Sequence, residues 1–120
     1  MDNIKLSKGK LYISVSVYVY QEGDAYVSYC PSLDLAGSGE SEAQARASFR
    51  VVLDEYIAYC VKNNTLHDDL TNHGWLKGGA SSSSPSLSDL LENNSLRDIM
   101  ETKEYSRYHE AVQVGNYAFV

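Results

Sequence analysis

Cysteine and positive charge are scarce in this chain of 120 residues, and each shortage excludes a class of protein. Cys30 and Cys60 follow no C-x-x-C pattern, which excludes a disulfide framework and a four-cysteine zinc site, so we predict buried free thiols. The 10 Lys and Arg residues against 16 Asp and Glu residues give a net charge of −6. This balance disfavours a protein that coats nucleic acid, because phosphate binding needs a basic patch.

Long apolar runs are also missing. No run approaches the ~20 residues that a membrane-spanning helix needs, and Met1–Lys10 lacks the apolar stretch of a signal peptide. With 43% hydrophobic and 22% charged residues, the composition is that of a globular domain with one core. The sequence therefore predicts a soluble, cytoplasmic protein with no membrane association.

The clearest structural signal is the alternation of Leu11–Tyr20. Aliphatic side chains occupy every second position, and tyrosines and serines occupy the others, as in a strand with one buried face. Turn residues follow at 21–24 and the alternation resumes at Ala25–Tyr29, which predicts a β-hairpin with a four-residue connection. A loop or a short edge strand is predicted around Leu33–Gly37.

A long amphipathic helix is predicted to begin after Ser41 and to end near Asn63. Ser41 and Gln44 have the spacing of a capping box. We expect the helix to pack on the aliphatic face of the hairpin and to bury Phe49 and Leu53 there. Apolar side chains recur at helical spacing over four turns: Ala45, Phe49, Val52, Leu53, Tyr56, Ile57 and Cys60.

These patterns predict an α+β fold in which one long helix packs on one face of an antiparallel three-stranded sheet. Residues 1–77 form this β-β-β-α domain, with Trp75 as a lid on the core, and the Gly- and Ser-rich stretch 78–85 is a flexible linker. Residues 86–120 contain two short helical segments and a terminal strand. They are too few for a core of their own, so we expect them to pack on the first domain or on a second copy.

Catalytic and metal sites are not predicted. One cluster of possible ligands has a spacing that does not place both histidines on one helical face: His67, Asp68, Asp69 and His73. Gly37–Ser41 precedes a helix but lacks the lysine of a P-loop and the further glycine of a dinucleotide fingerprint. A metal-dependent nuclease needs convergent carboxylates, whereas Asp24, Asp34 and Glu40 are all predicted to lie in turns. We therefore predict a non-enzyme without a cofactor.

One stretch, from Tyr26 to Tyr56, resembles the N-terminal domain of HicB-like antitoxins. A strand leads into Pro-x-Leu, a glycine-bearing loop, a Gly-[Asp/Glu]-[Ser/Thr] turn and an alanine-rich helix. The residues that match this motif are Pro31, Leu33, Gly37, Gly39, Glu40, Ser41 and Ala45. The resemblance covers about half of the chain, and it implies a reduced ribonuclease-H-like fold without that fold's catalytic carboxylates.

The resemblance further implies that the protein binds a small basic ribonuclease toxin of the HicA type and masks its active site. Between Pro31 and Cys60 the chain carries five carboxylates and two arginines, which suits a basic partner. Members of the family commonly oligomerise, and we expect a homodimer or higher oligomer. Possible interface residues are the tyrosines of the hairpin and the apolar residues of the C-terminal strand: Tyr12, Tyr18, Tyr20, Tyr26, Val112, Val114, Tyr117 and Phe119.

Three alternative functions stay open. The first is a DNA-binding autorepressor of the same lineage, which many family members achieve with a C-terminal ribbon-helix-helix or helix-turn-helix domain. Here residues 86–120 end in a strand and are acidic, which counts against direct nucleic-acid binding. The second is a stand-alone oligomeric binding module, and the third, more remote, is a metal-dependent nuclease.

Overall fold

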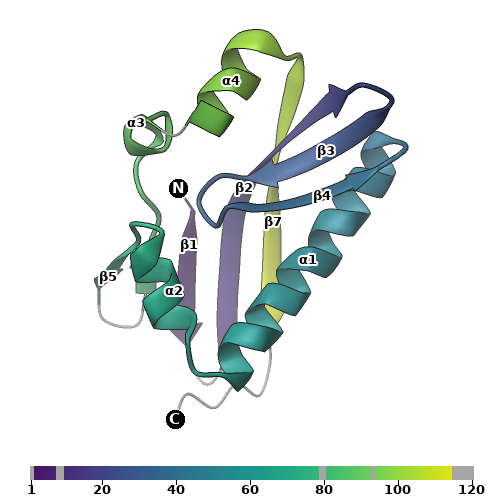
Figure 1. The fold of residues 1–120 in the computed structure, drawn as a ribbon. Helices are drawn as coiled ribbons and strands as arrows, with labels where there is room; N and C mark the ends of the chain where they lie inside the picture. Colours follow the sequence, from purple (N-terminus) through teal and green to yellow (C-terminus); the bar gives the residue numbers. More distant parts are fainter. Residues whose placement is uncertain (1, 8–9, 79–80, 93, 115–120) are drawn as a thin grey trace.

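The computed structural model describes residues 2–7, 10–78, 81–92 and 94–114. It is an α+β fold built on one antiparallel sheet of seven strands, with the long helix α1 packed against it (Figure 1). The elements in chain order are β1 (Asn3–Ser7), β2 (Lys10–Glu22), β3 (Ala25–Cys30), β4 (Leu35–Gly39), α1 (Glu42–Lys62), α2 (Leu66–Asn72), β5 (Leu76–Gly78), β6 (Ser81–Ser83), α3 (Leu87–Leu90), α4 (Asn94–Thr102) and β7 (Tyr105–Val114).

The α+β class, the antiparallel sheet and the long helix are confirmed, but the prediction of three strands is wrong. The additional strands gain their hydrogen bonds from partners far away in the sequence. The predicted linker supplies one of them, because Ser81–Ser83 forms β6 between β5 and β1. A serine-rich stretch carries no strand pattern of its own, but its backbone groups pair here with an available sheet edge.

Strand β2 is the centre of the sheet. One of its edges pairs with β7 from Leu11 to Tyr20. The other edge pairs first with β1, up to Ser14, and then with β3, from Tyr18 onward. The sheet therefore has two wings on that edge, β1-β6-β5 and β3-β4.

A buried carboxylate, that of Asp2, fills the gap between the two wings. The Ser16 backbone N–H and the Ser16 hydroxyl both donate to Asp2 Oδ1 at 2.8 Å. The Ser32 hydroxyl donates to Asp2 Oδ2 at 2.7 Å, and the Trp75 indole donates to the Ser32 carbonyl. Asp2 is only 6% exposed, so these donors satisfy a charge whose burial would otherwise be costly. Trp75, 4% exposed, closes the core as predicted.

The β2–β3 hairpin has a two-residue turn, Gly23-Asp24, instead of the predicted four-residue connection. Gly23 has φ +61, and glycine at the first position is typical of a type II′ turn, whose twist matches that of the strands. Because the turn has two residues, each even-numbered residue of β2 lies opposite an odd-numbered residue of β3, and each odd-numbered residue lies opposite an even-numbered one. Tyr26 therefore pairs with Gln21 and faces α1, on the opposite side of the sheet from Tyr18, with which it was grouped as a possible interface residue.

Helix α1 begins and ends as predicted. The Ser41 side chain accepts a hydrogen bond from the Gln44 N–H at 3.1 Å, and Gln44 Oε1 accepts one from the Glu40 N–H. The helix ends at Asn63, and Asn64 then takes φ +56, which asparagine tolerates.

The main core lies between α1 and the aliphatic side of β2, as predicted. Phe49 and Leu53 are fully buried in one cluster with Val15 and Val17. The two cysteines are also in this cluster, buried and free, which confirms the predicted thiol state: Cys30 and Cys60.

No helix in the described residues is long and apolar enough to span a membrane.

A second, smaller cluster lies on the other side of the sheet, where α4 buries Leu96 and Ile99 against Tyr18 and Tyr29. The two predicted helical segments after residue 86 are thus α3 and α4. The strand that follows them, β7, pairs with this chain's own sheet. Of the predicted terminal strand, residues 115–120 lie outside the described residues.

Candidate protein interface

The residues from Pro31 to Ala45 form the junction between the β3–β4 turn and the start of α1. Its two glycines allow α1 to lie directly on β4: a Cβ at Gly37 would come within 2.4 Å of the Phe49 backbone nitrogen, and one at Gly39 within 2.9 Å of the Ala45 nitrogen. Leu33 and Ala45 are buried in the core. Most of the motif residues thus support the position of α1.

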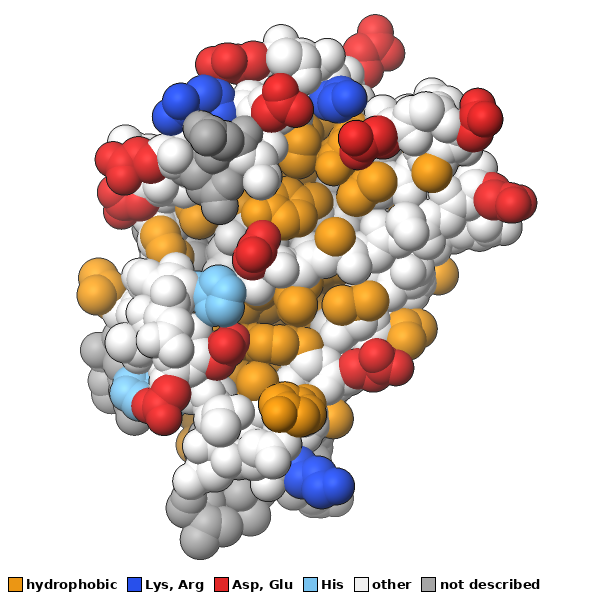
Figure 2. Space-filling model, viewed as in Figure 1, with side chains coloured by type: hydrophobic (Ala, Val, Ile, Leu, Met, Phe, Trp, Pro, Cys, Tyr) orange, Lys and Arg blue, Asp and Glu red, His pale blue; other side chains and the backbone are white. Residues whose placement is uncertain are grey.

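Beside this junction lies a surface that we name the α1–α2 face, formed by Asp34 and Leu35 at the β3–β4 turn, Val52, Glu55, Tyr56 and Tyr59 on α1, and Asp69 on α2. Figure 2 shows hydrophobic side chains in a band between α1 and α2, with carboxylates around it and Lys or Arg only at its upper and lower ends. Leu35 and Tyr56 pack on the main core from outside, and Tyr59 is 67% exposed. An apolar centre with a charged rim is the anatomy of a protein interface.

Tyr56 ties α1 to α2 at the centre of this face. Its hydroxyl donates a short hydrogen bond to Asp69 Oδ2, and His73 Nδ1 lies 3.5 Å from the same oxygen. Burial, and then the hydrogen bond to Asp69, raise the pKa of Tyr56 well above its usual range. The hydrogen bond between Tyr56 and Asp69 therefore joins α1 to α2.

The arginines of α1 are turned away from the α1–α2 face, toward β7. Arg46 lies over the ring of Tyr108, 4.3 Å from its centroid. Arg50 donates to Glu110 at 2.9 Å and pairs with Asp54 on its own helix. The helix therefore directs Arg46 and Arg50 to β7 and leaves Glu55 on the side of the α1–α2 face.

The predicted interface tyrosines lie in different environments. Tyr12 is 39% exposed on the side of β2 away from α1, whereas Tyr18 is buried under α4 and Tyr20 is half-buried beside it. Tyr26 faces α1. Of the C-terminal residues, Val112 is buried in the main core and Val114 ends β7, while Tyr117 and Phe119 lie outside the described residues.

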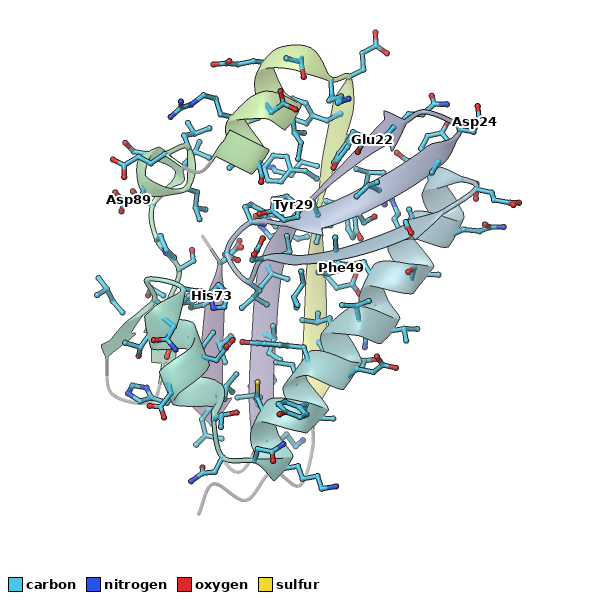
Figure 3. The ribbon with its side chains drawn as sticks, in the orientation of Figure 1. Glu22, Asp24, Tyr29, Phe49, His73 and Asp89 are labelled. Carbon is cyan, nitrogen blue, oxygen red and sulfur yellow. The ribbon has the colours of Figure 1, made fainter. Side chains whose placement is uncertain are left out.

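Of the possible metal and nuclease residues, only Asp69 and His73 are found in contact within the described residues, at 3.5 Å. Within the described residues no three His, Cys, Asp or Glu side chains are placed to hold a metal ion. Asp34 precedes β4 and Glu40 follows it, so the extended strand separates them. Figure 3 shows Glu22 and Asp24 at the tip of the β2–β3 hairpin, far from His73 at the end of α2 and from Asp89 in α3.

Comparison of the chain with protein-family models, with curated proteins and with solved structures finds no match to any of them.

Sequence reasoning missed the exposed stripe of α1. It assigned Val52 and Tyr56 to the buried stripe, but both are only half-buried, at the edge of that stripe. Tyr59 falls outside the buried positions on a helical projection, and a large aromatic residue there was the available signal.

Proposed function

We propose that this protein is a non-catalytic binding protein that occludes a small basic ribonuclease, in the manner of a HicB-like antitoxin. The observation that carries the proposal is the α1–α2 face, where apolar side chains and carboxylates share one surface while the helix arginines point away from it. The motif of β3, β4 and α1 supports the same lineage. Occlusion needs a complementary surface and no reactive group.

The face has the two components that such binding requires. The exposed ring of Tyr59 and the half-buried Leu35 and Val52 offer apolar area, and aromatic anchors carry much of the energy in protein interfaces. Asp34 and Glu55 are exposed and would attract a basic partner, which raises the association rate more than the final affinity.

The test is co-expression with the small basic protein that the resemblance leads us to expect in an adjacent reading frame. We expect the two to co-purify and the RNA cleavage of the partner to be lost in the complex. Tyr59→Ala should weaken binding by at least about 10-fold, the effect of a moderate hot spot. Glu55→Lys should mainly slow association, and Glu101→Lys on α4, which changes the charge equally, should not.

The result that would contradict the proposal is specific. If the partner protein cleaves RNA equally well with and without this chain, or if Tyr59→Ala and Glu55→Lys bind it as the unmodified chain does, the α1–α2 face is not the inhibitory surface. Cleavage of RNA by the purified chain itself would favour the nuclease alternative.

We also propose that the outer edge of β7 joins two copies in a homodimer. Within the described residues β7 pairs only with β2, which leaves ten residues of strand with one open edge. The β4 edge is shielded instead, because the Ser38 N–H donates to the Ser48 hydroxyl of α1. Unshielded edges of this length readily pair with another strand, and an antiparallel pair of identical strands has the two-fold symmetry of a dimer.

Sedimentation across a concentration series tests the dimer. Ala111→Lys should shift the equilibrium toward monomer, because lysine on an edge opposes pairing, while Ala36→Lys on β4 should not. The β7 edge is not a dimer interface if the chain sediments as a monomer at every concentration, or if Ala111→Lys leaves a dimer unchanged.

A further inference from the structure

Within the described residues, no helix covers the side of the sheet opposite α1 over β1 and over the Tyr12 end of β2 and β7, and we name this side of the three strands the open face. Cross-strand neighbours define its rows: Lys5, Tyr12 and Gln113 in one, and Asn3, Ser14 and Ala111 in the next. All of these side chains are exposed except that of Ser14, which is half-buried. Among the described residues, α3 and α4 reach this side only at its Tyr18 end.

Positive charge collects on the open face, although the whole chain carries −6. Lys5 and Lys10 lie at one end, and Arg107 lies opposite Tyr18 at the other, with all three side chains exposed. His109, opposite Ser16, adds a fourth nitrogen base between them. The two lysines come from the two strands of the β1–β2 hairpin, and the arginine comes from β7.

The carboxylates of the same three strands are directed elsewhere. Glu110 points to the α1 side and pairs with Arg50. Asp2 is buried, with its oxygens already accepting three hydrogen bonds. Glu22 lies past the end of the β7 pairing, at the hairpin tip. Between Lys10 and Arg107, the described part of this surface therefore carries no exposed carboxylate.

The shape of the open face suits flat ligand groups. Tyr12, 39% exposed, stands among small side chains such as Ser14 and Ala111, so its ring is accessible from above. Two shallow hollows follow one another along β2 and β7, one of about 380 Å³ beside Tyr12 and one of about 280 Å³ beside His109. Lys10 and Arg107 are about 26 Å apart along the strands, at about 3.3 Å per residue.

We propose that the open face binds single-stranded nucleic acid. Tyr12 stacks on a base, as exposed aromatic residues do on single-strand-binding sheets. Lys5 and Lys10 contact phosphates at one end of the bound strand, and Arg107 contacts a phosphate several nucleotides away at the other end. A duplex fits poorly, because its bases are stacked inside and no element of this face projects into a groove. The face lies on the opposite side of the sheet from α1, so this activity is independent of partner binding at the α1–α2 face.

The experiment measures fluorescence anisotropy of labelled oligouridine RNA, oligothymidine DNA and a DNA duplex, each of about twelve units, which is within the site size of one single-strand-binding domain. We expect both single strands to bind and the duplex to bind more weakly. With three phosphate contacts the affinity should fall about 20-fold between about 50 and 200 mM salt. A preference for RNA over DNA would indicate contacts to the 2′-hydroxyl.

Two substitutions and two matched controls locate the site. Tyr12→Ala should weaken single-strand binding by at least about 5-fold, the loss of one stacked base. The double substitution Lys5→Gln and Lys10→Gln should weaken binding and flatten its salt dependence. Tyr59→Ala and Lys62→Gln change the same residue types on α1 and should leave binding unchanged.

Each outcome bears on the proposal. Thermal unfolding of every variant checks that the fold is kept, which is expected because the substituted side chains are exposed. The proposal is overturned if no single strand binds at about 50 mM salt, if the duplex binds as tightly, or if the controls lose as much affinity as the open-face variants.

Discussion

The two sides of the sheet differ in how their residues are used, although the same strands form both. On one side α1 covers a continuous aliphatic core that includes Phe49, Val15 and Val17. On the other, α4 covers only the Tyr18 end, and the remaining surface is polar and basic. The alternation of β2 thus specifies two surfaces of different kinds, one buried under α1 and one largely exposed.

The largest expected effect separates the two clusters. Phe49→Ala should lower the free energy of unfolding by about 3–5 kcal/mol, because it opens a cavity in the main core. Leu96→Ala, in the smaller cluster under α4, should cost about 2–3 kcal/mol, the low end for buried leucine. Urea unfolding of both variants measures the difference. Equal losses would show that the two sides contribute equally to stability.

High pH should destabilise the side covered by α1. Burial raises the pKa of the Cys30 thiol to about 11 from 9.0, so the folded chain holds this proton more tightly than the unfolded chain. Unfolding then releases a proton between these values, and the free energy of unfolding should fall by about 2 kcal/mol from pH 9 to pH 11. Tyr29 and Tyr56, whose pKa values are also raised by burial, add to the fall above pH 10.

Urea unfolding at pH 8, 9 and 10 tests the contribution of Cys30. In Cys30→Ala the decline between pH 9 and pH 10 should be smaller, because the titrating thiol is gone, while Leu96→Ala should keep the full decline. If the free energy of unfolding of Cys30→Ala falls with pH as steeply as that of the unmodified chain, the Cys30 thiol is not the source of the fall.

The contact between α1 and β4 should tolerate no added atom. Gly37→Ala places a Cβ against the Phe49 backbone, so α1 has to shift, at a cost of about 1–3 kcal/mol. Ala36→Ser adds an atom to the neighbouring exposed position and should change stability by less than about 0.5 kcal/mol. Thermal unfolding of the pair gives the comparison, and similar melting temperatures would mean that α1 can move away from β4 at little cost.

The smallest expected effect is at the edge of the covered side. Glu110→Gln removes the ion pair with Arg50, in which the two side chains are 17% and 44% exposed, and should cost at most about 1 kcal/mol. The loss should shrink further in about 0.5 M salt, because salt screens a partly exposed pair. A salt-independent loss would indicate that Glu110 acts through packing.

Much of the covered side could be predicted from the sequence, because its signals are local. The capping box of Ser41 and Gln44 and the apolar stripe of α1 fix the helix within a few residues. Strand β2 has an unbroken alternation, and Trp75 was rightly placed in the core. These features depend on residues close together in the chain, and the spacing of apolar residues along the sequence reveals them.

The strands missed by the sequence analysis depend on distant partners. β1 pairs with β2 on one edge and β6 on the other, and neither β1 nor the serines of β6 show a strand pattern strong enough to be recognised alone. The open face could not be foreseen for the same reason. Lys5 and Arg107 share a surface only because β1 and β7 both flank β2.

The turn and the helix beside the candidate interface were predicted from the sequence, but the side chains that they expose were not. The turn and helix residues from Pro31 to Ala45 were identified by resemblance, but which neighbouring side chains are exposed depends on the angle at which α1 crosses the sheet. Tyr59 shows this, since its exposure follows from the stripe that α1 buries.

The pairing of β7 with β2 has a consequence for the order of events during synthesis. Ser16 and His109 lie opposite each other but are 93 positions apart in the chain. The ribosome therefore delivers β2, its hairpin partner and α1 long before the strand that completes the other edge of β2. Until then that edge is open to any strand nearby, including the same edge of a neighbouring nascent chain. Contacts between residues so far apart in the chain form slowly. The newly made protein is therefore exposed to misassembly until β7 has paired with β2.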